Sequence, residues 1–303
     1  MEFSEKVKAV SNMQKYIIEH LDENITLDEI ANVAGYSKYH ALRIFKEMTG
    51  RTLYETIRAL KLTKAAQTLI FNNEKVVDVA MSNGFDSHDE FTRAFYRQFG
   101  ITPQKYRKET PPINWFVHYP IEDYYILKEG GKKMPMLNEK VSRTVTVSVV
   151  ERPARKLIYL RHNGTDYFSG CEEVGCDWEG FYNSIPEKFD TAAGGRLPKF
   201  LILPDTNGMA FFVEVPLDYS KPVPKEYEIA DLPPCTYLYF NGMPFEDPND
   251  FSIAIGILNE AIENYPFEKF GWEISDEGPY LGMGAKPETG ARAAVPVRKI
   301  TKN

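Results

Sequence analysis

The sequence TLDEIANVAGYSKYHALRIFKEMTGRT, at residues 26–52, recurs in outline at residues 79–103 as VAMSNGFDSHDEFTRAFYRQFGITP. Each copy places a glycine, Gly35 or Gly84, shortly before a serine, Ser37 or Ser87. Each copy therefore predicts a short helix, a turn marked by the glycine, and a second helix that begins at the serine. This is the outline of a helix-turn-helix, and two copies in one chain predict a double contact with DNA.

Residue pairs at the expected helix starts support this interpretation. Thr26 and Glu29 have the spacing of a capping box, in which two side chains satisfy two otherwise unpaired backbone amides. Ser87 and Glu90 repeat this spacing in the second copy. Both pairs therefore predict helix N-termini.

The rest of residues 1–109 also predicts helices. Apolar residues recur at helical spacing through residues 4–20, and Thr102-Pro103 is typical of a helix start. Residues 53–71 contain neither glycine nor proline and predict one helix between the two copies. At about 1.5 Å per residue, that helix is about 28 Å long, which would separate two recognition helices by about one turn of DNA.

The composition is that of a soluble protein with two domains. Of the 303 residues, 43% are hydrophobic and 26% are charged. No apolar run approaches the roughly 18 residues that a membrane span requires, and the polar residues 1–8 predict no signal peptide. Cys171, Cys176 and Cys235 are too few for a disulfide framework and predict free thiols rather than a metal site. We therefore expect a cytoplasmic protein without membrane contact.

Charge is unevenly distributed along the chain. The net charge is -7, yet residues 1–109 carry 16 Lys and Arg against 15 Asp and Glu. The acidity therefore lies in residues 110–303. Because the helical region is nearly neutral, its contacts with phosphate would depend on clustered cations rather than on bulk charge.

The helix expected after Gly35 can present a polar face to DNA. Arg43 is the best candidate to read a base, because its planar guanidinium matches the edge of guanine. Tyr39 can contact a thymine methyl group or a phosphate, and Ser37 with the first amides of the helix can hold a phosphate. The candidate DNA-binding residues are Ser37, Lys38, Tyr39, His40 and Arg43. The expected buried stripe is Leu42, Phe45 and Met48.

The second copy is a weaker candidate for base reading. Asp89 and Glu90 lie near the start of its second helix, where their charges would repel phosphates. Its candidate DNA-binding residues are Ser87, His88 and Arg93. We therefore expect the first copy to read bases and the second to contact mainly the backbone.

From Thr110 onward the sequence pattern changes. Pro111-Pro112 ends the helical region, and the segment to residue 141, with Gly130-Gly131, predicts a linker. Its aromatic residues are expected to dock it against one of the domains. These residues are Trp115, Phe116, Tyr119, Tyr124 and Tyr125.

Residues 142–303 predict an α+β domain. The strand-like segments are 144–150, 155–161, 200–203, 209–215, 226–231, 235–240, 280–285 and 292–299, and the helix-like segments are 171–185 and 251–265. The order strand-strand-helix-strand-strand occurs twice, which predicts a duplicated unit. The expected fold is thus multidomain, with an all-α double helix-turn-helix domain (1–109), a linker (110–141) and this α+β domain (142–303).

Residues 26–107 resemble the AraC/XylS transcription regulators. The resemblance runs from Ile30-Ala31 through Gly35-Tyr36-Ser37 and continues in the second copy from Phe85 to Arg107. It implies base contacts at Tyr39, Leu42 and Arg43, although a polar residue is usual at the position of Leu42. The N-terminal placement of this domain resembles the Rob-type subgroup, which implies that residues 142–303 form a GyrI-like effector-binding domain.

The C-terminal region is rich in aromatic residues that could line a cleft for a flat apolar ligand. Glu214 and Glu273 are the acids that could face a cationic ligand. In GyrI-like domains that bind cations, a glutamate is common on a late strand, but residues 278–284 (GPYLGMG) contain no acid. The candidate ligand-binding residues are Tyr159, Trp178, Tyr182, Phe212, Glu214, Tyr237, Tyr239, Trp272 and Tyr280.

Two alternatives remain for the C-terminal region. It could hydrolyse a small molecule through water activated by Glu214, or it could bind another protein. We find no catalytic triad or metal-ligand pattern, so we expect no enzyme activity, cofactor or metal.

These features together predict a ligand-responsive transcription regulator. Its expected partners are double-stranded DNA, a small apolar or aromatic effector, and RNA polymerase. Because one chain already supplies two recognition helices, we expect a monomer that binds an asymmetric site. Activation is the expected mode of control.

Overall fold

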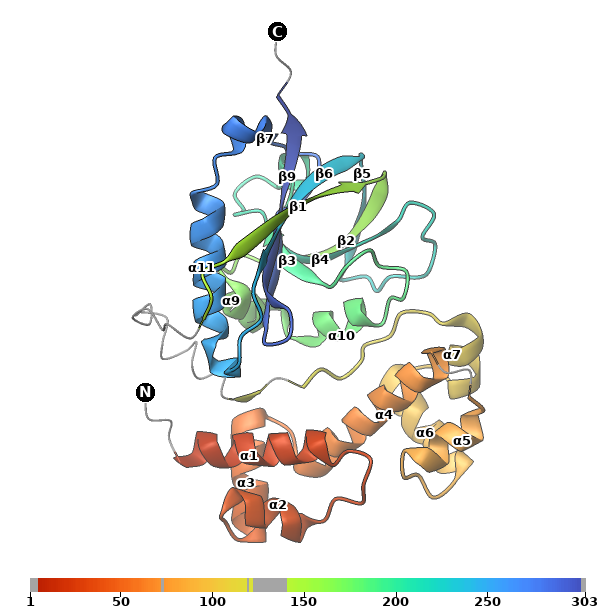
Figure 1. Ribbon diagram of the computed structural model, residues 1–303. Coiled ribbons are helices and arrows are strands. Elements are labelled where there is room, and N and C mark those ends of the chain that lie inside the picture. Colours follow the sequence, from red (N-terminus) through yellow and green to blue (C-terminus); the bar gives the residue numbers. More distant parts are fainter. Residues whose placement is uncertain (1–4, 72–73, 119, 122–140, 301–303) are drawn as a thin grey trace. The chain divides into compact units, whose positions relative to one another are not determined.

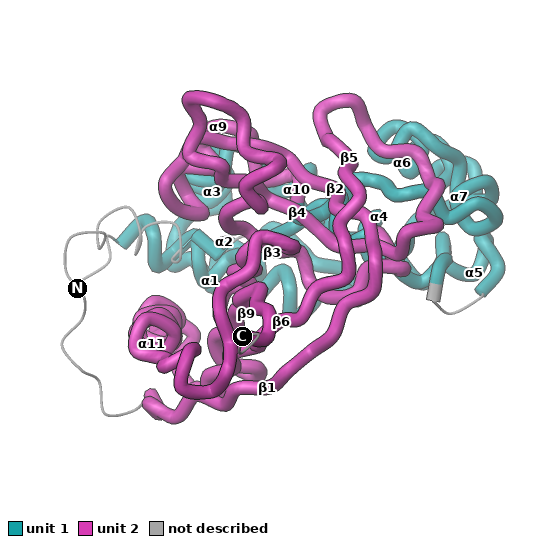
Figure 2. The backbone as a smooth tube through the Cα atoms, turned by 90° about the horizontal axis from the view of Figure 1, so that it is seen from above, with its two compact units in different colours: residues 1–131, 179–184 teal, residues 132–178, 185–303 magenta. Residues whose placement is uncertain are grey.

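The computed structural model describes residues 5–71, 74–118, 120–121 and 141–300 (Figure 1). The chain divides into two compact units (Figure 2). The helical unit comprises Met1–Gly131 together with Glu179–Ser184, and the sheet-rich unit comprises Lys132–Trp178 and Ile185–Asn303. The predicted order of a helical region followed by a sheet-rich region is confirmed.

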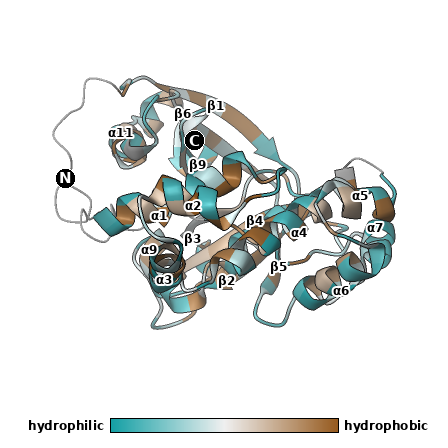
Figure 3. Cartoon of the chain, turned by 90° about the horizontal axis from the view of Figure 1, so that it is seen from below, coloured by the Kyte–Doolittle hydropathy of each residue, from teal (hydrophilic) through white to brown (hydrophobic). Residues whose placement is uncertain are grey.

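The helical unit is built from amphipathic helices, on which apolar and polar positions alternate in bands (Figure 3). The helices are α1 (Glu5–Glu19), α2 (Leu27–Ala34), α3 (Lys38–Thr49), α4 (Leu53–Phe71), α5 (Val76–Ser82), α6 (His88–Phe99) and α7 (Pro103–Glu109). The long helix predicted at residues 53–71 is therefore confirmed at both ends.

Two hydrophobic cores meet along α4. The first core unites α1, α2 and α3 around Met13, Ile30 and Phe45, and it includes Leu53 and Leu60 from the first half of α4. The second core unites α5, α6 and α7, and its members from α4 are Leu62, Ala65, Ala66 and Leu69. The first half of α4 thus packs in the first core and the second half in the second core, so α4 carries one helix-turn-helix on each half.

The two predicted turns form as expected. Gly35 and Gly84 have φ angles of 68° and 75°, a left-handed conformation that side chains with a Cβ atom disfavour. The predicted capping box of Thr26 and Glu29 is complete. Its hydrogen bonds lower the pKa of Glu29, because the Thr26 hydroxyl and then the Thr26 amide both donate to the charged carboxylate.

The second predicted capping box is only half formed. Ser87 accepts a hydrogen bond from the Glu90 amide at 3.1 Å, as expected. The Glu90 carboxylate, however, accepts a hydrogen bond from the amide of Asp86 at 3.4 Å rather than from that of Ser87. It also lies 3.5 Å from Arg58 of α4, an ion pair that the local spacing could not predict.

The chain after α7 packs against the helical unit. Ile113 and Trp115 join the second core, and Phe116 and Ile121 pack against the first. The helical unit therefore extends beyond the predicted boundary at residue 109, because apolar residues of the predicted linker are buried in it. Docking was expected for Trp115 and Phe116, and both pack against the helical unit. The other three aromatic residues that were expected to dock are Tyr119, Tyr124 and Tyr125, and they lie outside the described residues, as do Gly130 and Gly131.

The sheet-rich unit contains helices α9 (Tyr167–Val174) and α11 (Phe251–Glu263), and the first residues of α10 (Asp177–Asn183). Its strands are β1 (Val145–Arg152), β2 (Arg155–Arg161), β3 (Ala193–Arg196), β4 (Met209–Pro216), β5 (Glu228–Leu232), β6 (Cys235–Gly242), β7 (Trp272–Ile274), β8 (Leu281–Lys286) and β9 (Gly290–Lys299).

All these strands, within the described part of the chain, form one antiparallel sheet in the order β1-β6-β9-β8-β3-β4-β2-β5, with β7 paired to β9. The register places Tyr159 opposite Phe212 and Leu157 opposite Glu214. Because side chains alternate along a strand, residues at alternate positions share one face of the sheet. Tyr237 and Tyr239 of β6 lie on one face of the sheet with Tyr159 and Phe212. Leu238 and Phe240 lie on the opposite face, where α11 packs against them.

The structure differs from the sequence prediction at four elements of this unit. The strand expected at residues 200–203 is a 3-10 helix, Lys199–Leu201, and the nearby strand β3, with Gly194 and Gly195, was not predicted. The helix expected at residues 171–185 is divided into α9 and α10, because Gly175 ends α9 with a φ of 83°. Strand β7 was also not predicted. Among the described residues, no helix combines the length and apolar character needed to cross a membrane.

Candidate nucleic-acid interface and effector site

The first helix-turn-helix exposes the polar face of α3. Tyr39 is 80% exposed, and Lys38 and Arg43 are also exposed. The buried stripe of α3 consists of Ala41, Ile44 and Phe45. Phe45 was predicted in this stripe, but Leu42 and Met48 are only partly buried, because the centre of the stripe follows the helical spacing from Ala41. The face that carries Arg43 is thus open to solvent.

Local contacts already engage several of the predicted DNA-binding residues. The Ser37 hydroxyl accepts a hydrogen bond from the His40 amide at 3.4 Å and caps α3. Nδ1 of His40 lies 3.3 Å from a guanidinium nitrogen of Arg43, which restrains that side chain. Lys38 forms an exposed ion pair with Asp28 at 2.7 Å. A phosphate near Lys38 would have to compete with this carboxylate.

The second helix-turn-helix presents α6 in the same way. Its predicted candidates, Ser87, His88 and Arg93, are all exposed, and so is Asp89. Ser87 caps the helix, as Ser37 caps α3. The negative charge at this end of α6 is therefore carried by Asp89 at full exposure, while Glu90 is partly balanced by Arg58.

Two exposed residues of α6 were missed in the sequence analysis. Tyr96, which is 57% exposed, and Arg97 follow Arg93 at three and four positions, so all three lie on one face of the helix. The same helical spacing, extended by one turn, would have identified them. They add a cation and an aromatic side chain to the exposed face of α6.

In the sheet-rich unit, aromatic side chains from several strands gather on one face of the sheet. Tyr159, Phe212, Tyr237 and Tyr239 belong to a single buried cluster with Leu281. All four aromatic residues are at most 5% exposed. Four of the nine predicted ligand-binding residues are therefore brought together, but they are packed against one another.

A buried ion pair lies beside this cluster. Arg155 is 0% exposed, and its Nε donates a hydrogen bond to Oε1 of Glu214 at 2.7 Å. The Tyr237 hydroxyl donates to the same carboxylate oxygen at 3.0 Å and accepts from Arg155 at 3.1 Å. A further guanidinium nitrogen of Arg155 donates to the Pro233 carbonyl at 2.6 Å. The charge of Glu214 is thus compensated within the protein.

The protonation states of this group follow from its surroundings. Burial alone would lower the pKa of the Arg155 guanidinium, but the charge of Glu214 and the contact with Tyr237 outweigh burial and raise it. Burial, and then the charge of Glu214, raises the pKa of Tyr237 well above its ordinary value. Arg155 therefore stays charged and Tyr237 stays a neutral hydrogen-bond donor.

A second group of charges continues from Glu214 toward the surface. Arg152 Nε lies 3.5 Å from Oε2 of Glu214, and Arg152 Nη2 donates to the Tyr239 hydroxyl at 2.7 Å. Asp190 lies 3.3 Å from Arg292 and 3.7 Å from Arg152. The carboxylates of Glu214 and Asp190 therefore each face at least one guanidinium group. The arginines of the group outnumber these two acids.

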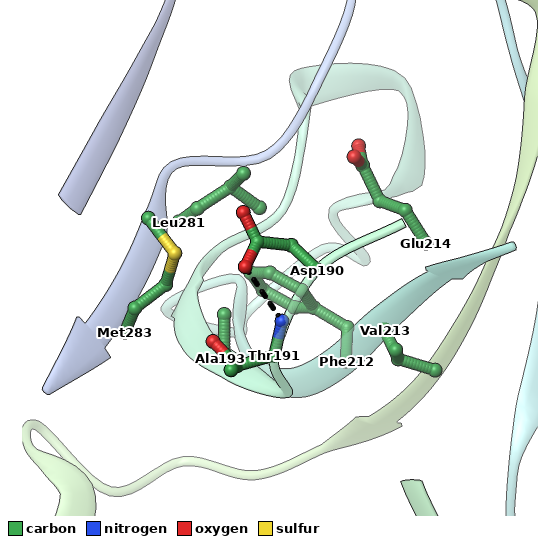
Figure 4. Close-up of a pocket in the computed structure, with 8 residues that line it drawn as sticks. All are labelled: Asp190, Thr191, Ala193, Phe212, Val213, Glu214, Leu281 and Met283. Atoms are coloured by element: carbon green, nitrogen blue, oxygen red, sulfur yellow. Dashed lines mark hydrogen bonds between the residues drawn. The ribbon is translucent and has the colours of Figure 1, made fainter. Parts of the chain in front are cut away.

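A shallow depression of about 230 Å³, part of it open solvent, lies beside these charges (Figure 4). Its lining consists of Asp190, Thr191, Ala193, Phe212, Val213, Glu214, Leu281 and Met283. Figure 4 shows Asp190 near the centre, where Oδ1 accepts a hydrogen bond from the Thr191 amide at 2.8 Å. Only about 10 Å³ of this space can be occupied by the centre of a water molecule, which is the room of roughly one water, so a larger ligand could enter only if the lining rearranged.

The other predicted ligand-binding residues lie elsewhere in the fold. Trp178 stacks on Phe211, with ring centroids 4.0 Å apart, and Phe211 alternates with Phe212 along β4, so its ring lies on the other face. Tyr182 belongs to the helical unit. Trp272 lies on β7 at the end of the sheet, and both it and Tyr280 pack near α11. Only Phe212 and Glu214 line the depression.

The arginines of this site, Arg152, Arg155 and Arg292, were not predicted from the sequence. Arg155 lies two positions before Leu157 on β2, so the alternation of side chains places it on the buried face. That alternation was a usable signal, but an arginine at a strand start is more often exposed. Glu273, the other suspected acid, forms an exposed ion pair with Arg298 and lies outside the depression.

The geometry of the helical unit defines a class of protein. Two helix-turn-helix units, each with an exposed second helix, lie on one connecting helix, the arrangement expected of a protein that grips DNA twice. A family model described as a helix-turn-helix domain matches residues 30–109.

Comparison with known proteins identifies the family. The chain is 37% identical over 100 residues to the regulatory protein SoxS of Escherichia coli K12, and the match covers 33% of this chain and 94% of SoxS. It is 41% identical to the probable transcription factor PqrA of Proteus vulgaris over 33% of this chain and 83% of PqrA. The chain belongs to the AraC/XylS family of helix-turn-helix regulators.

Two further matches each cover about a third of this chain. The transcriptional regulator Rob of Salmonella typhimurium is 44% identical over 91 residues, which cover 30% of this chain and 32% of Rob. The chain thus matches about a third of the length of this relative. Among solved structures, the DNA-binding domain of AdpA in complex with a target DNA is 26% identical, covers 33% of this chain and 91% of that chain, and gives a TM-score of 0.32.

Proposed function

We propose that this protein is a transcription regulator that binds a specific, asymmetric DNA site as a monomer. The observation that carries the proposal is the pair of exposed helices, α3 and α6, on the two halves of α4. Each follows a glycine turn and carries an exposed arginine at the matching position, Arg43 or Arg93. One chain thereby supplies two recognition helices, as in the DNA-binding class to which its helical region belongs.

The two helices differ in charge, which supports different roles. The first turn of α3 carries no acid, whereas that of α6 carries Asp89 and Glu90. A carboxylate near a phosphate costs free energy, so α6 is less suited to close contact at its start. We therefore assign base reading to α3 through Arg43, and mainly backbone contact to α6 through Arg93 and Arg97.

Replacing Arg43 with alanine is expected to weaken binding to the preferred site by about 5- to 150-fold, because a bidentate contact with guanine is worth about 1–3 kcal/mol. The loss should be confined to one half of the selected motif, which becomes degenerate. The measurement is in vitro selection of DNA sites with the full chain at fixed salt, followed by affinity measurements on the enriched site.

Arg93→Ala is the matched comparison, because Arg93 has the equivalent position on α6. It should weaken binding to all sequences similarly and reduce the slope of affinity against salt by about one. The assignment is wrong if Arg93→Ala abolishes sequence preference and Arg43→Ala preserves it. Failure of the wild-type chain to enrich any site would reject the proposed function itself.

For the C-terminal region we propose a GyrI-like effector-binding domain built from a duplicated unit. The strand order supports the duplication. Exchanging β1, β2, β3 and β4 with β5, β6, β8 and β9 turns the order β1-β6-β9-β8-β3-β4-β2-β5 into its own reverse. Each half also carries helix between its second and third strands, and Pro153 and Pro233 occupy equivalent bends after β1 and β5.

We propose further that a small, uncharged aromatic or apolar effector binds at the depression beside Phe212 by displacing side chains of its lining. Binding changes how the protein engages DNA or RNA polymerase, with activation as the regulatory outcome. The buried aromatic cluster supplies apolar surface. Glu214 and Asp190 already face guanidinium groups, so a cationic ligand would have to displace an arginine. The same pairing disfavours hydrolysis by water activated at Glu214, because the Glu214 carboxylate is held by Arg155.

Filling the depression is expected to prevent effector binding. Thr191 is exposed at its rim, and Thr191→Trp would place an indole there while keeping the backbone hydrogen bond to Asp190. Small neutral aromatic compounds should raise the melting temperature of the wild-type chain, since a ligand that binds only the folded state stabilises it. They should leave the melting temperature of Thr191→Trp unchanged.

The control for this substitution is Thr206→Trp, which places the same side chain at an exposed site outside the depression lining. It should respond to the compounds as the wild type does. Equal responses of all three proteins would contradict a site at the depression, and preference for cationic compounds would contradict the assigned ligand charge.

A further inference from the structure

The described residues between α7 and residue 121 form a strap on the helical unit, which we define as residues 110–118, 120 and 121. In Figure 1 this segment runs back from α7 along α4. It lies beyond the match to the helix-turn-helix family model, which ends at residue 109. The strap thus lies outside the part of the chain that the family model describes.

The first half of the strap is fixed in the second core. Ile113 and Trp115 are each 7% exposed and pack with residues of α4, α5, α6 and α7. The Ile113 amide donates a buried hydrogen bond of 2.9 Å to the hydroxyl of Ser184. Gly180 lies so close that a Cβ atom there would be 1.8 Å from the Trp115 carbonyl oxygen. The strap is thus held between the second core and residues 179–184 of the same unit.

The second half of the strap is fixed to α4 and α1. The Phe116 amide donates to the Thr63 hydroxyl of α4 at 2.8 Å, and the Ile121 amide donates to Oε1 of Gln14 in α1 at 2.8 Å. Ile121 is 6% exposed in the first core. The guanidinium of Arg51 lies 4.9 Å from the centre of the Phe116 ring. Both acceptors, Thr63 and Gln14, are buried.

These contacts join the two cores by a second route besides α4. Helix α4 has 19 residues, and long helices are rarely straight and curve gently. A strap that is buried at one end in each core opposes that bending. Releasing it would leave the buried oxygens of Gln14 and Thr63 without their donors and would expose Ile121 to water, so the strapped state is favoured.

We propose that the strap sets the distance and angle between α3 and α6, and thereby the spacing between the two half-elements of the DNA site that the protein accepts. Thr63, Gln14 and Phe116 are positioning residues for DNA recognition, although they lie in the interior and do not touch DNA. The inference rests on the proposed DNA binding and adds to it a determinant of specificity outside the helix-turn-helix units.

The test is a double variant, Gln14→Leu with Thr63→Val, in the full chain. Thr63→Val keeps the side-chain size and Gln14→Leu nearly keeps it. Together they remove the two oxygen atoms that accept from the strap amides, and Gln14→Leu also removes the side-chain amide nitrogen. The matched control is Gln67→Leu with Thr68→Val, the same two substitutions at half-buried positions of α4. Thr68 donates to a carbonyl of its own helix and has no described hydrogen bond to the strap.

Affinity is measured for the selected DNA site and for sites with one base pair added or removed between its two half-elements. Each base pair changes the separation by about 3.4 Å and the rotation by about 35°. The wild type and the control should lose about tenfold in affinity at the altered sites, the worth of one lost base contact. The strap variant should lose less than about threefold, with similar binding to an isolated half-element.

An unchanged spacing preference in a folded strap variant overturns the proposal, as does an equal relaxation in the control. If the double variant does not fold, Phe116→Leu replaces it, because this change keeps an apolar side chain and removes the ring beneath Arg51. A second measurement needs no DNA. The distance between spin labels at exposed Lys46 and Arg97 should broaden in the strap variant, and an unchanged distribution would reject the strap even if DNA binding fails.

Discussion

Arg155→Ala is expected to destabilise the sheet-rich unit by about 3–5 kcal/mol, because it removes the closest cation from the buried carboxylate of Glu214. Arg155 is fully buried and donates to Glu214 and to the Pro233 carbonyl, so its loss leaves Glu214 with the Tyr237 hydroxyl and the more distant Arg152, and takes the Arg155 hydrogen bond from the Pro233 carbonyl. Hydrogen exchange measured by mass spectrometry should show faster exchange in β2, β4 and β6 and little change in α1–α4. Exchange by segment suits a protein of two units, for which a single unfolding free energy is not defined.

Two further variants test the cause of this loss. Arg298→Ala removes an arginine from an exposed ion pair with Glu273 and should leave exchange unchanged. Arg155→Met combined with Glu214→Leu removes both charges and should recover much of the stability, since an apolar pair of similar size avoids the buried charge. No recovery in the double variant would indicate that packing, rather than charge, accounts for the effect.

Phe95→Ala is expected to destabilise the second core by about 3–5 kcal/mol, the usual range for removing a buried phenylalanine side chain. Phe95 is fully buried, and its ring lies 5.5 Å from Phe91, 4.7 Å from Phe99 and 5.6 Å from Tyr106. The substitution leaves a cavity among these rings. Amide exchange in α5, α6 and α7 should increase, with a smaller effect on α2 and α3, which belong to the first core.

The neighbouring residue provides the control for Phe95. Tyr96→Ala truncates an aromatic side chain on the same helix that is 57% exposed, and should change stability by no more than about 0.5 kcal/mol. Since Tyr96 lies on the face of Arg93, its replacement can still weaken DNA binding. Equal destabilisation by the two variants would contradict the assignment of Phe95 to the core.

The sequence predicted the helical region closely because its signals are local. A left-handed glycine, a capping threonine and a run of apolar residues at helical spacing each act within a few residues. Gly35, Thr26 and residues 53–71 therefore behave as predicted. The half-formed cap at Ser87 shows the limit of this approach, because Arg58, distant in sequence, competes for Glu90.

The sheet-rich region depends more on contacts between distant segments, which the sequence does not display. Gly194 and Gly195 disfavour a strand by propensity, yet β3 forms because it completes the sheet between β4 and β8. At Gly195 a Cβ atom would lie 2.1 Å from the Tyr280 carbonyl oxygen, so close packing explains this glycine. The pairing of Arg155 with Glu214, far apart in sequence, was hidden for the same reason.

Residues 179–184 belong to the helical unit although they follow the first strands of the sheet along the chain. The helical unit is consequently not formed by one continuous segment of the chain that could be exchanged by itself. A gene fusion that transferred residues 1–131 alone to another sensor would lose Gly180 and Ser184, and with them the cover over Trp115. A fusion of the DNA-binding half to another sensor would therefore need residues 179–184, or other side chains in their place, to keep Trp115 covered.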